Sequence, residues 1–340
     1  MMGEAAPARD RIAGDVERVR NPAAAAPDAQ IVLSVLVPFY GSDPSELLRD
    51  LARCAATLDD AVEIVCADDA SPDPLFGAAA IAVAEAVDGT AVTVLLAGRN
   101  RGRSRIRNLL AEQARGGHVL FLDGDMSVER ETFLADYIAL IRSRPVGIAF
   151  GGFDMELGVD DDPSHDLHVW SSRRDHCLPA VDRQRDPAKY AYTSNLLVRR
   201  DVMLACPFSD AFRGWGWEDV DWAIRAMKLA PIVQVDNPAV HRGFSSAEVL
   251  LRKYRESVAN FEVLYGRHPG EVERLPLFRA ARLAARLPFP RAMLRLLEAT
   301  VIDRFRILPM RLRDMSLKLY RAWLYRDIAA RAGTRGGETA

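Results

Sequence analysis

The chain has 340 residues, of which 49% are hydrophobic and 27% charged, and its formal net charge is −2. This length is enough for one large domain or two smaller ones with a substantial core. The near-neutral charge gives no indication of a nucleic-acid partner, and no run of about 18 apolar residues predicts a membrane span. The cysteines, at positions 54, 66, 177 and 206, lack metal-ligand spacing, which favours buried thiols in a reducing compartment over a disulfide framework.

The two ends of the chain carry no clear pattern. Residues 1–30 mix charges with Pro and Ala and lack the apolar centre of a signal peptide, so we expect a disordered or loosely helical lead. Residues 331–340 predict a disordered tail. With no export signal recognised, we expect a cytoplasmic protein.

Strands and helices alternate through the next hundred residues. Apolar runs predict strands over 31–37, 62–67, 91–96 and 118–122, and helices are predicted from residue 43 and over 75–87. This alternation predicts an α/β fold with a mostly parallel, doubly wound central sheet flanked by helices.

Acidic residues follow two of these strands. Asp68 and Asp69 come after the second, and Asp123 and Asp125 come after the fourth. Because the carboxyl ends of parallel strands share the edge at which such sheets bind ligands, we expect all four acids on one rim. Two carboxylates there suit Mg²⁺ or Mn²⁺, with a substrate diphosphate completing the coordination. The alternative is an acidic loop whose Asp residues cap the next helix.

Five arginines occur at alternate positions between the third and fourth strands, in the segment Gly98–Asn108. Next to two glycines and a predicted helix start, they indicate a diphosphate site. A solvated basic loop is the alternative.

Four segments in this order, VLVPFYG, ADDAS, NRGRSRIRN and FLDGDM, resemble the inverting family 2 glycosyltransferases of GT-A fold over about residues 31–245. The resemblance implies a nucleotide-diphosphate sugar donor and a divalent metal, Mn²⁺ or Mg²⁺. It also implies Asp123 and Asp125 as the metal-binding pair. Gly41 departs from the Asn that is common in the family. The expected donor-binding residues are Pro38, Tyr40, Asp68, Asp69, Asn100, Arg107 and Asp123, together with Trp215 of the segment described next.

A second segment, Gly214-Trp215-Gly216-Trp217-Glu218-Asp219, is similar to the Gly-Trp-Gly-Gly-Glu-Asp segment of β-1,4-galactosyltransferases and chondroitin-type bacterial polymerases. The similarity implies Asp219 as general base, Glu218 as a residue that orients the acceptor, and Trp215 packing on the sugar. Position 217 departs from it, with Trp in place of Gly. The alternative is that the acids favour a helix N-terminus and the tryptophans belong to the core.

The same resemblance makes His241 an additional metal ligand, with a solvated turn as the alternative. Thr193, Ser194 and Asn195 are candidates for contact with the donor sugar. The polar stretch 160–186, with three histidines, predicts a variable acceptor-side loop.

Charge is concentrated near the C-terminus. From Leu275 to Arg326, twelve Lys or Arg stand against three Asp or Glu, a net charge of +9 in a chain whose total is −2. Leu, Met and Trp recur there at helical intervals. Such a segment either lies on an anionic membrane surface or packs its apolar stripe on the core.

We therefore expect a nucleotide-sugar-binding half over 31–130, an acceptor-binding and catalytic half over 131–270, and a basic amphipathic helical extension over 271–330. The predicted function is metal-dependent, inverting transfer of Gal, GalNAc or GlcNAc from a UDP-sugar to a glycan or lipid-linked acceptor. Such transfer would serve cell-surface polysaccharide synthesis at the cytoplasmic face of a membrane. The alternatives are a non-catalytic carbohydrate- or nucleotide-binding protein and a sugar-phosphate nucleotidyltransferase, whose Gly-rich N-terminal signature is missing here.

Overall fold

The structure, a computed structural model, describes residues 7–26, 30–58, 61–155, 162–288 and 290–335. The chain divides into two compact units. Unit 1 consists of Met1–Glu156, Cys177–Asp210 and Trp222–Gly243, and unit 2 consists of Leu157–His176, Ala211–Asp221 and Phe244–Ala340.

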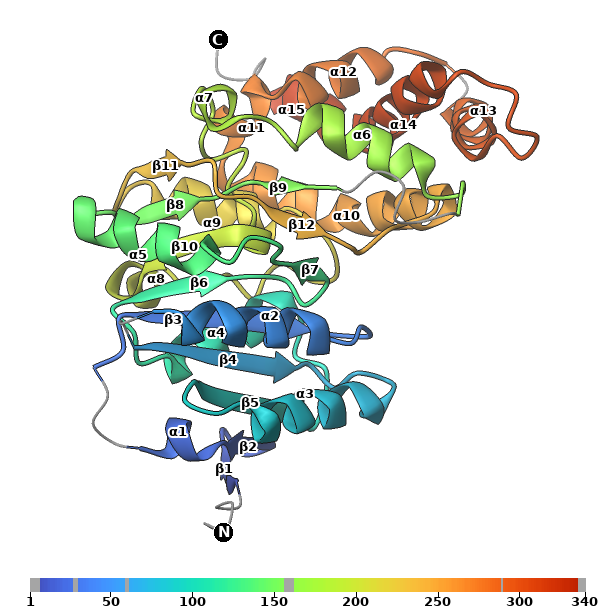
Figure 1. The fold of residues 1–340 in the computed structure, drawn as a ribbon. Helices are drawn as coiled ribbons and strands as arrows, with labels where there is room; N and C mark the ends of the chain where they lie inside the picture. Colours follow the sequence, from blue (N-terminus) through green and yellow to red (C-terminus); the bar gives the residue numbers. More distant parts are fainter. Residues whose placement is uncertain (1–6, 27–29, 59–60, 156–161, 289, 336–340) are drawn as a thin grey trace. The chain divides into compact units, whose positions relative to one another are not determined.

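Unit 1 is built on a nine-stranded sheet (Figure 1) with the order β1-β2-β5-β4-β3-β6-β10-β8-β11. Strand β3 pairs in parallel with β4 and β6, and β4 pairs in parallel with β5, so the centre of the sheet is parallel, as predicted. The strands are β1 (Ala8–Ile12), β2 (Val16–Arg20), β3 (Leu33–Phe39), β4 (Val62–Asp68), β5 (Ala91–Ala97), β6 (His118–Phe121), β8 (Ile148–Phe150), β10 (Leu196–Arg199) and β11 (Ile232–Gln234).

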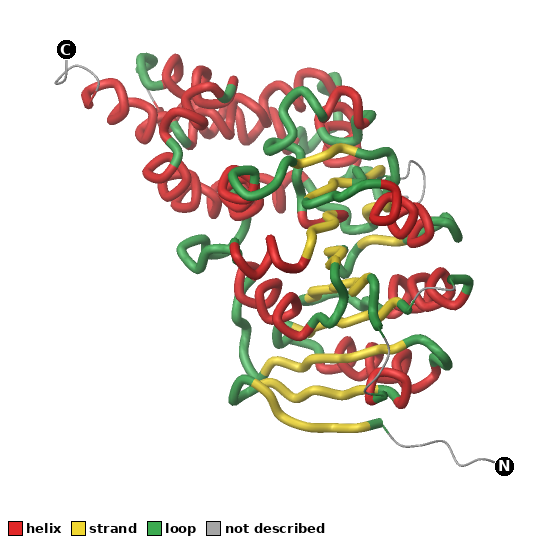
Figure 2. Tube along the Cα trace, turned by 90° about the vertical axis from the view of Figure 1, so that its left-hand side faces the viewer, coloured by secondary structure: helices red, strands yellow, loops and turns green. Residues whose placement is uncertain are grey.

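Helices cover both faces of this sheet (Figure 2). Along β3, Val35 and Val37 pack on the side of α2 (Ser45–Ala56), α3 (Pro74–Ala86) and α5 (Phe133–Ser143). Leu36 packs on the other side, with α4 (Arg103–Gln113) and α8 (Arg200–Ala205). Because successive side chains of a strand point to opposite faces, a strand covered on both sides needs a continuous apolar run. The apolar runs of the sequence therefore form the middle of the sheet.

A second, three-stranded sheet of unit 1 has the order β7-β12-β9. Its strands are β7 (Met126–Ser127), β9 (Phe153–Asp154) and β12 (Ala239–His241). His241 pairs with Met126, so this sheet brings His241 next to the residue that follows Asp125.

The N-terminal segment differs from the predicted lead. Within residues 7–26, β1 and β2 form an antiparallel hairpin, β2 pairs with β5, and α1 (Pro22–Ala25) follows. These strands, ARDRI and VERVR, lie at the edge of the sheet, and only Val16 and Val19 are fully buried. The sequence therefore contains no apolar run there that would predict a strand.

The secondary structure described in unit 2 is helical. None of the helices that the structure describes combines the length and the apolar character needed to cross a bilayer. The helices of unit 2 are α6 (Asp166–Asp175), α10 (Ala247–Arg267), α11 (Pro269–Arg274), α12 (Pro276–Ala284), α13 (Pro290–Ile302), α14 (Met310–Leu324) and α15 (Arg326–Arg335), while α9 (Glu218–Ala226) runs from unit 2 into unit 1.

The polar stretch 160–186, predicted as a loop, contains helices α6 and α7 (Ala180–Arg183) where the structure describes it; positions 160 and 161 lie outside the described residues. Leu167 of α6 is fully buried within unit 2, and Arg183 of α7 is buried within unit 1. The Arg183 guanidinium donates to the Val235 carbonyl and the Gln234 side chain, both over 2.8 Å. A buried arginine reads as polar in the sequence, which is why the pattern predicted a loop.

Candidate active site

The acidic segments that follow β4 and β6 lie at one edge of the sheet in unit 1. Phe39 lies opposite Asp68 in the register of β3 and β4, and the Asp69 N–H donates to the Phe39 carbonyl over 3.0 Å. The Gly124 N–H donates to the Pro38 carbonyl over 3.1 Å. A Cβ at Gly124 would lie 2.6 Å from the Phe39 Cβ, so glycine allows the Asp-Gly-Asp segment to approach β3 this closely.

Asp69 holds the loop that precedes α4. Its carboxylate oxygens accept hydrogen bonds from the N–H groups of Arg101 (2.6 Å) and Gly102 (2.9 Å), and its carbonyl accepts from the Asn100 side chain (3.1 Å). Burial raises the pKa of Asp69, although these two N–H donors oppose the rise. Asp69 therefore fixes the start of α4, and Asn100 lies against it at the surface.

Ser71 links the loops that follow β3 and β4. Its N–H donates to the buried Asp68 carboxylate over 2.8 Å, and its hydroxyl accepts from the Gly41 N–H over 3.0 Å. Tyr40, directly before Gly41, is exposed. An exposed aromatic ring on a fixed loop suits packing against a flat ligand group.

Several arginines of segment 98–108 form ion pairs. Arg99 and Arg101 contact Asp15 in the loop of the N-terminal hairpin, and Arg105 Nε lies 3.0 Å from an Asp210 carboxylate oxygen. These three arginines therefore stabilise the surroundings of the loop. The sequence, which left a phosphate site and a solvated loop open, did not predict these partners.

Arg107 reaches the Asp-Gly-Asp segment. Its side chain is 2% exposed, and it donates to Asp123 Oδ1 over 3.0 Å. Burial raises the pKa of Asp123, but the charges of Arg107 and Arg103 outweigh this effect and hold the pKa below its ordinary value. Asp123 is therefore ionised at neutral pH. The sequence predicts that Asp123 binds the donor and the metal, and one of its two carboxylate oxygens accepts a hydrogen bond from Arg107.

Asp125 and His241 form the candidate metal pair. Asp125 Oδ2 lies 3.6 Å from His241 Nε2, and a Cβ at Gly243 would collide with the Asp125 carboxylate, so glycine leaves room for it. A carboxylate and a neutral imidazole are both ligands of divalent cations, and this donor set fits such an ion. Among the described residues no group of three or more His, Cys, Asp or Glu forms a complete metal cluster. The other ligands of a cation here would come from substrate and water.

Trp215 and the acceptor-side candidates belong to unit 2, in the loop that leads into α9 and in the first turn of that helix. Glu218 is buried and begins the helix, and Asp219 is partly buried in its first turn. The Trp215 ring lies 5.7 Å from the Tyr254 ring of α10. Acids in the first turn also interact favourably with the helix dipole, so both carboxylates stabilise the start of α9.

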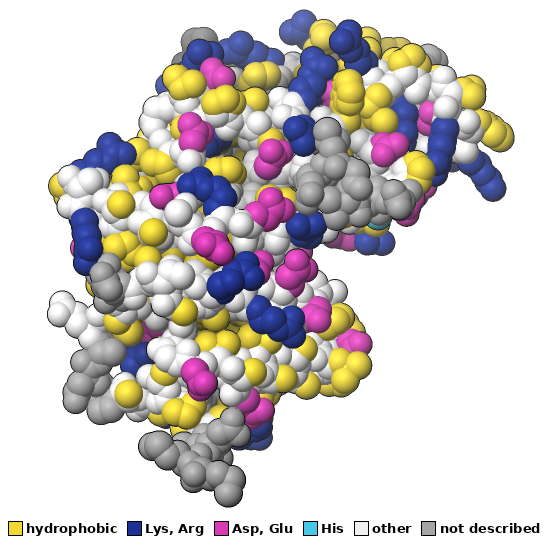
Figure 3. All heavy atoms as spheres, in the orientation of Figure 1, with side chains coloured by type: hydrophobic (Ala, Val, Ile, Leu, Met, Phe, Trp, Pro, Cys, Tyr) yellow, Lys and Arg dark blue, Asp and Glu magenta, His cyan; other side chains and the backbone are white. Residues whose placement is uncertain are grey.

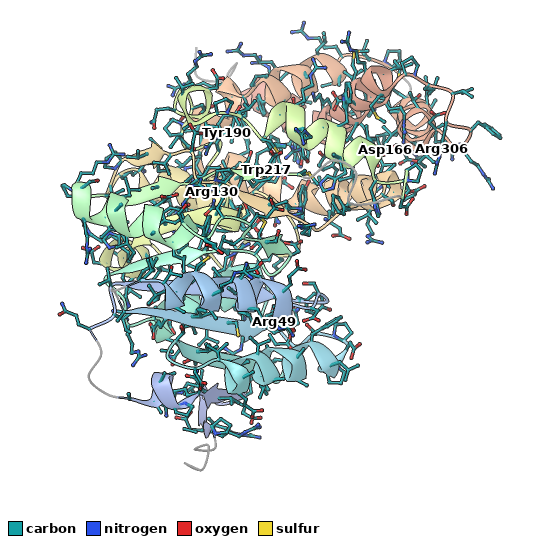
Figure 4. The ribbon with its side chains drawn as sticks, in the orientation of Figure 1. Arg49, Arg130, Asp166, Tyr190, Trp217 and Arg306 are labelled. Atoms are coloured by element: carbon teal, nitrogen blue, oxygen red, sulfur yellow. The ribbon has the colours of Figure 1, made fainter. Side chains whose placement is uncertain are left out.

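Trp217, which is labelled in Figure 4, anchors this loop to the C-terminal helices. Its indole N–H donates to the Tyr325 hydroxyl over 3.0 Å, its ring lies 5.0 Å from the Phe261 ring, and the Arg321 guanidinium lies 4.6 Å from its ring centroid. Its φ of +76° is rare for a bulky residue and easy for glycine, which the similar segments have at this position. Trp at position 217 therefore strains the backbone more than glycine would, but its side chain fixes the loop to the neighbouring helices.

Asn260 of α10 holds the loop before α9, a role that the sequence did not predict. Its Oδ1 accepts from the Arg213 N–H over 3.0 Å, and its Nδ2 donates to the Arg213 and Gly216 carbonyls, both over 2.9 Å. Asn260 is buried beside Phe261 and Leu264. A buried amide on the apolar face of a helix was the available signal, but the sequence does not reveal which loop it binds.

Asp221, the third acid of the segment, has a structural role. It is fully buried and contacts His268 Nε2 at 3.0 Å and Arg267 Nη1 at 3.3 Å. These contacts tie the start of α9 to the end of α10.

Asn195 also serves the fold. In the short 3-10 helix Thr193–Asn195, its Oδ1 accepts from the Tyr137 hydroxyl over 2.7 Å, and its Nδ2 donates to the carbonyls of Gly152 (2.7 Å) and Asn237 (2.8 Å). Asn195 is fully buried and its amide is used by the fold, and contact of Thr193–Asn195 with the donor sugar stays a prediction.

The candidate residues thus fall into two groups. The metal-side candidates and all donor-side candidates except Trp215 lie in unit 1, whereas Trp215 and the acceptor-side candidates lie in unit 2. The first group is Pro38, Tyr40, Asp68, Asp69, Asn100, Arg107, Asp123, Asp125 and His241, and the second is Trp215, Glu218 and Asp219.

The chain is similar to known glycosyltransferases in sequence. Undecaprenyl-phosphate 4-deoxy-4-formamido-L-arabinose transferase of Pseudomonas paraeruginosa (strain DSM 24068 / PA7) is 31% identical over 182 residues, which are 52% of this chain and 50% of that protein. The protein of the same name from Pseudomonas aeruginosa (strain LESB58) is 36% identical over the same shares. The chain therefore spans about half the length of these curated relatives.

Solved structures share the fold. The mannosyltransferase PcManGT from Pyrobaculum calidifontis, in complex with GDP-Man and Mn²⁺, matches with a TM-score of 0.55 and 18% identity over 90% of this chain and 88% of that one. Residues 1–349 of TarS from S. aureus, in complex with UDP-GlcNAc, match with a TM-score of 0.52 and 17% identity over 89% and 92%. At these identities the likeness concerns the fold.

The sequence profile of one family, described as glycosyl transferase family 2, matches residues 34–204, half of the chain. This range contains β3 from its second residue onward, both acidic segments and the arginine-bearing start of α4. Because the profile and the GT-A arrangement of the sheet agree, the chain belongs to glycosyl transferase family 2.

Proposed function

We propose that the protein transfers a sugar from a UDP-sugar to a glycan or lipid-linked acceptor, with inversion at the anomeric carbon. One observation carries this proposal: Asp125 lies 3.6 Å from His241, two residues after an Asp123 that is paired with Arg107. This set of charges suits a nucleotide diphosphate held with a divalent cation.

On the donor side, Arg107 is buried beside the Asp123 carboxylate and cannot move freely. Its fixed positive charge stabilises negative charge that develops on a departing diphosphate. Asp125 and His241 would hold Mn²⁺ or Mg²⁺, which when bound supplies further positive charge to the leaving group.

On the acceptor side, Asp219 is the proposed general base. Direct displacement requires the acceptor hydroxyl to lose its proton as its oxygen attacks, and a positioned carboxylate accepts that proton. A single displacement on the face opposite the leaving group inverts the anomeric carbon. Glu218 would orient the acceptor, and Trp215 would pack on a sugar ring.

The comparisons support the substrate classes without naming the sugar. The solved neighbours hold UDP-GlcNAc or GDP-Man with Mn²⁺, and the curated relatives are named for transfer to undecaprenyl phosphate. We favour Gal, GalNAc or GlcNAc as the sugar because of the Gly-Trp-Gly-Trp-Glu-Asp segment. A lipid-linked acceptor lies in a membrane, and residues 275–326 are basic. Both features favour a reaction at the cytoplasmic face of a membrane, in the synthesis of cell-surface polysaccharide.

A donor screen tests this function. The purified protein is incubated with Mn²⁺ and UDP-, GDP- or dTDP-sugars, each with and without a polyprenyl phosphate, and nucleotide release is measured. We expect release of UDP from at least one UDP-sugar, with Asp125→Asn inactive and Asp210→Asn, at the ion pair with Arg105, fully active. No release from any donor would favour a binding protein that has kept the fold.

A further inference from the structure

The C-terminal helices of unit 2 expose an unusual number of large hydrophobic side chains. Among the described residues, eight of the fifteen exposed large hydrophobic side chains fall within residues 283–319, so the exposure is concentrated there. They are Leu283, Leu287, Leu296, Phe305, Ile307, Leu312, Met315 and Leu319.

Exposed basic side chains accompany these hydrophobic ones. Every member of the set except Met315 is a sequence neighbour of an exposed Arg or Lys, as in Arg282-Leu283, Arg295-Leu296 and Lys318-Leu319. Figure 3 shows hydrophobic and basic side chains intermingled over these helices. We call this set, with its basic neighbours, the basic-apolar surface.

The basic-apolar surface is not an unfilled part of the core. Leu297 and Val301 of α13 and Leu317, Tyr320 and Trp323 of α14 are buried in one cluster. The apolar stripe noted in the sequence is therefore divided, with one side packed inside unit 2 and the other in solvent. Packing in a core thus holds for one side of these helices, and the membrane alternative concerns only the exposed side.

The turn between α13 and α14 holds the two most exposed members. Phe305 is 81% exposed and Ile307 is 76% exposed, and Arg304 and Arg306 alternate with them. The buried Asp303 carboxylate accepts from the Ile307 N–H over 3.2 Å and the Leu308 N–H over 2.9 Å. The turn is thus fixed from its buried side while its apolar side chains stay in solvent.

We propose that the turn Arg304–Ile307 inserts Phe305 and Ile307 into the interface of an anionic lipid membrane, while the arginines of the basic-apolar surface lie among lipid phosphates. Interleaved apolar and basic side chains match the two layers of such an interface, acyl chain and headgroup. The inference rests on the proposed function at a membrane. It narrows the part of the chain that enters the lipid from residues 275–326 to the turn Arg304–Ile307.

Charge decides between the possible occupants of this surface. A second copy of the chain would present the same excess of positive charge, and like charges facing each other oppose such a symmetric contact. A nucleic acid would satisfy the arginines but would leave Phe305 and Ile307 without an apolar partner. An anionic bilayer satisfies both kinds of side chain.

Vesicle flotation of the full chain tests the proposal, with vesicles of phosphatidylcholine alone or mixed with phosphatidylglycerol. We expect salt-sensitive binding to the mixed vesicles only. The double variant Phe305→Ser, Ile307→Ser should bind roughly tenfold more weakly or worse. The matched control is Leu75→Ser, Val181→Ser, which removes side chains of similar exposure, 69% and 71%, from unit 1 and should bind as the unchanged protein does.

Equal binding by both double variants, or no binding of the unchanged protein to anionic vesicles, would overturn the proposal. So would a self-association seen by light scattering that the Phe305→Ser, Ile307→Ser variant abolishes. Nucleotide release from a UDP-sugar without lipid separates the two levels, because it tests the transferase alone. Normal release with failed flotation defeats only the membrane contact, and normal flotation with no release defeats only the proposed function.

Discussion

At the scale of single residues, the Arg107–Asp123 pair decides the electrostatics of the donor edge. The arginine is almost fully buried, and its charge is balanced by an aspartate whose pKa it holds below the ordinary value. A buried charge that loses its partner is strongly destabilising, which makes this pair sensitive to substitution. The pair is thus a structural requirement of the fold as well as a candidate contact for the donor.

We expect Arg107→Gln to lower the free energy of unfolding at neutral pH by about 3 kcal/mol. The stability that comes from a depressed Asp pKa is fully present above the unfolded-state pKa of about 3.9 and is lost as the pH falls through the lower folded-state value. The difference between variant and unchanged protein should therefore shrink as the pH falls below about 4. Urea unfolding at several pH values measures it, and a difference that does not vary with pH would contradict the ion-pair explanation.

Asp219 carries the acceptor-side chemistry in our proposal. Asp219→Asn removes the proton acceptor at nearly constant size, so transfer should fall by about 10²-fold or more while nucleotide binding stays nearly unchanged. Turnover assays and calorimetric titration with UDP measure the two effects. Asp327→Asn, on the surface of unit 2, is the control. An equal loss of UDP binding in Asp219→Asn would argue for a donor-side role.

At the scale of elements, α10 and α14–α15 hold the loop that carries the acceptor-side residues. Asn260 of α10 bonds the backbone at Arg213 and Gly216, and Trp217 bonds Tyr325, which follows α14. The Tyr325 hydroxyl also lies 2.5 Å from the Ser257 hydroxyl of α10. The C-terminal helices therefore hold the loop before α9 in place and are not a separate appendage.

Asn260→Ala should lower kcat strongly with little change in the donor KM, because it frees the loop before Glu218 and leaves the donor-side residues in place. Asn260→Asp keeps the acceptor for the Arg213 N–H and loses the N–H donors, so its kcat should lie between those of Asn260→Ala and the unchanged protein. Asn21→Ala is the matched control. Asn21 is an equally buried amide that bonds the backbone at Ala24, Val87, Thr90 and Val92, so its loss should lower stability by about 1–3 kcal/mol without changing kcat.

At the scale of the whole molecule, the fold of unit 2 depends on its C-terminal third. Phe278 of α12, Tyr325, and Ile328 of α15 complete the cluster that buries Phe212 and Phe261. The Tyr325 and Phe261 rings are stacked with centroids 4.0 Å apart. Apolar burial on this scale is the main source of stability in a small helical unit.

A chain that ends at Leu275 should therefore lose the native fold of α10 and of the loop before α9. Limited proteolysis is expected to cut α10 in the shortened chain and to spare it in the full one, while the strands β3–β6 of unit 1 stay protected. Protection of α10 in the shortened chain would show that the cluster around Phe261 does not need the C-terminal helices. This outcome also explains why point variants, and not this deletion, are used to test membrane binding.

The local sequence determined much of this protein. The apolar runs of β3, β4, β5 and β6 predicted a parallel sheet because strands covered on both faces need them. The acids after β4 and β6 predicted the ligand edge because parallel strands end together. The same short segments carry the resemblance to the family, so family membership can be inferred from local sequence alone.

Tertiary structure alone decided the rest, because it depends on partners far apart in the chain. The charged strand β2 is ordered by its pairing with β5. The Asp69 carboxylate accepts a hydrogen bond from the loop before α4, and the Asn195 amide bonds backbone carbonyls in the interior. Asn260 and Trp217 acquire their roles only from contacts with the loop before α9 and with Tyr325. A local pattern records what a residue prefers, whereas the long-range contacts of the folded chain fix which neighbour satisfies that preference.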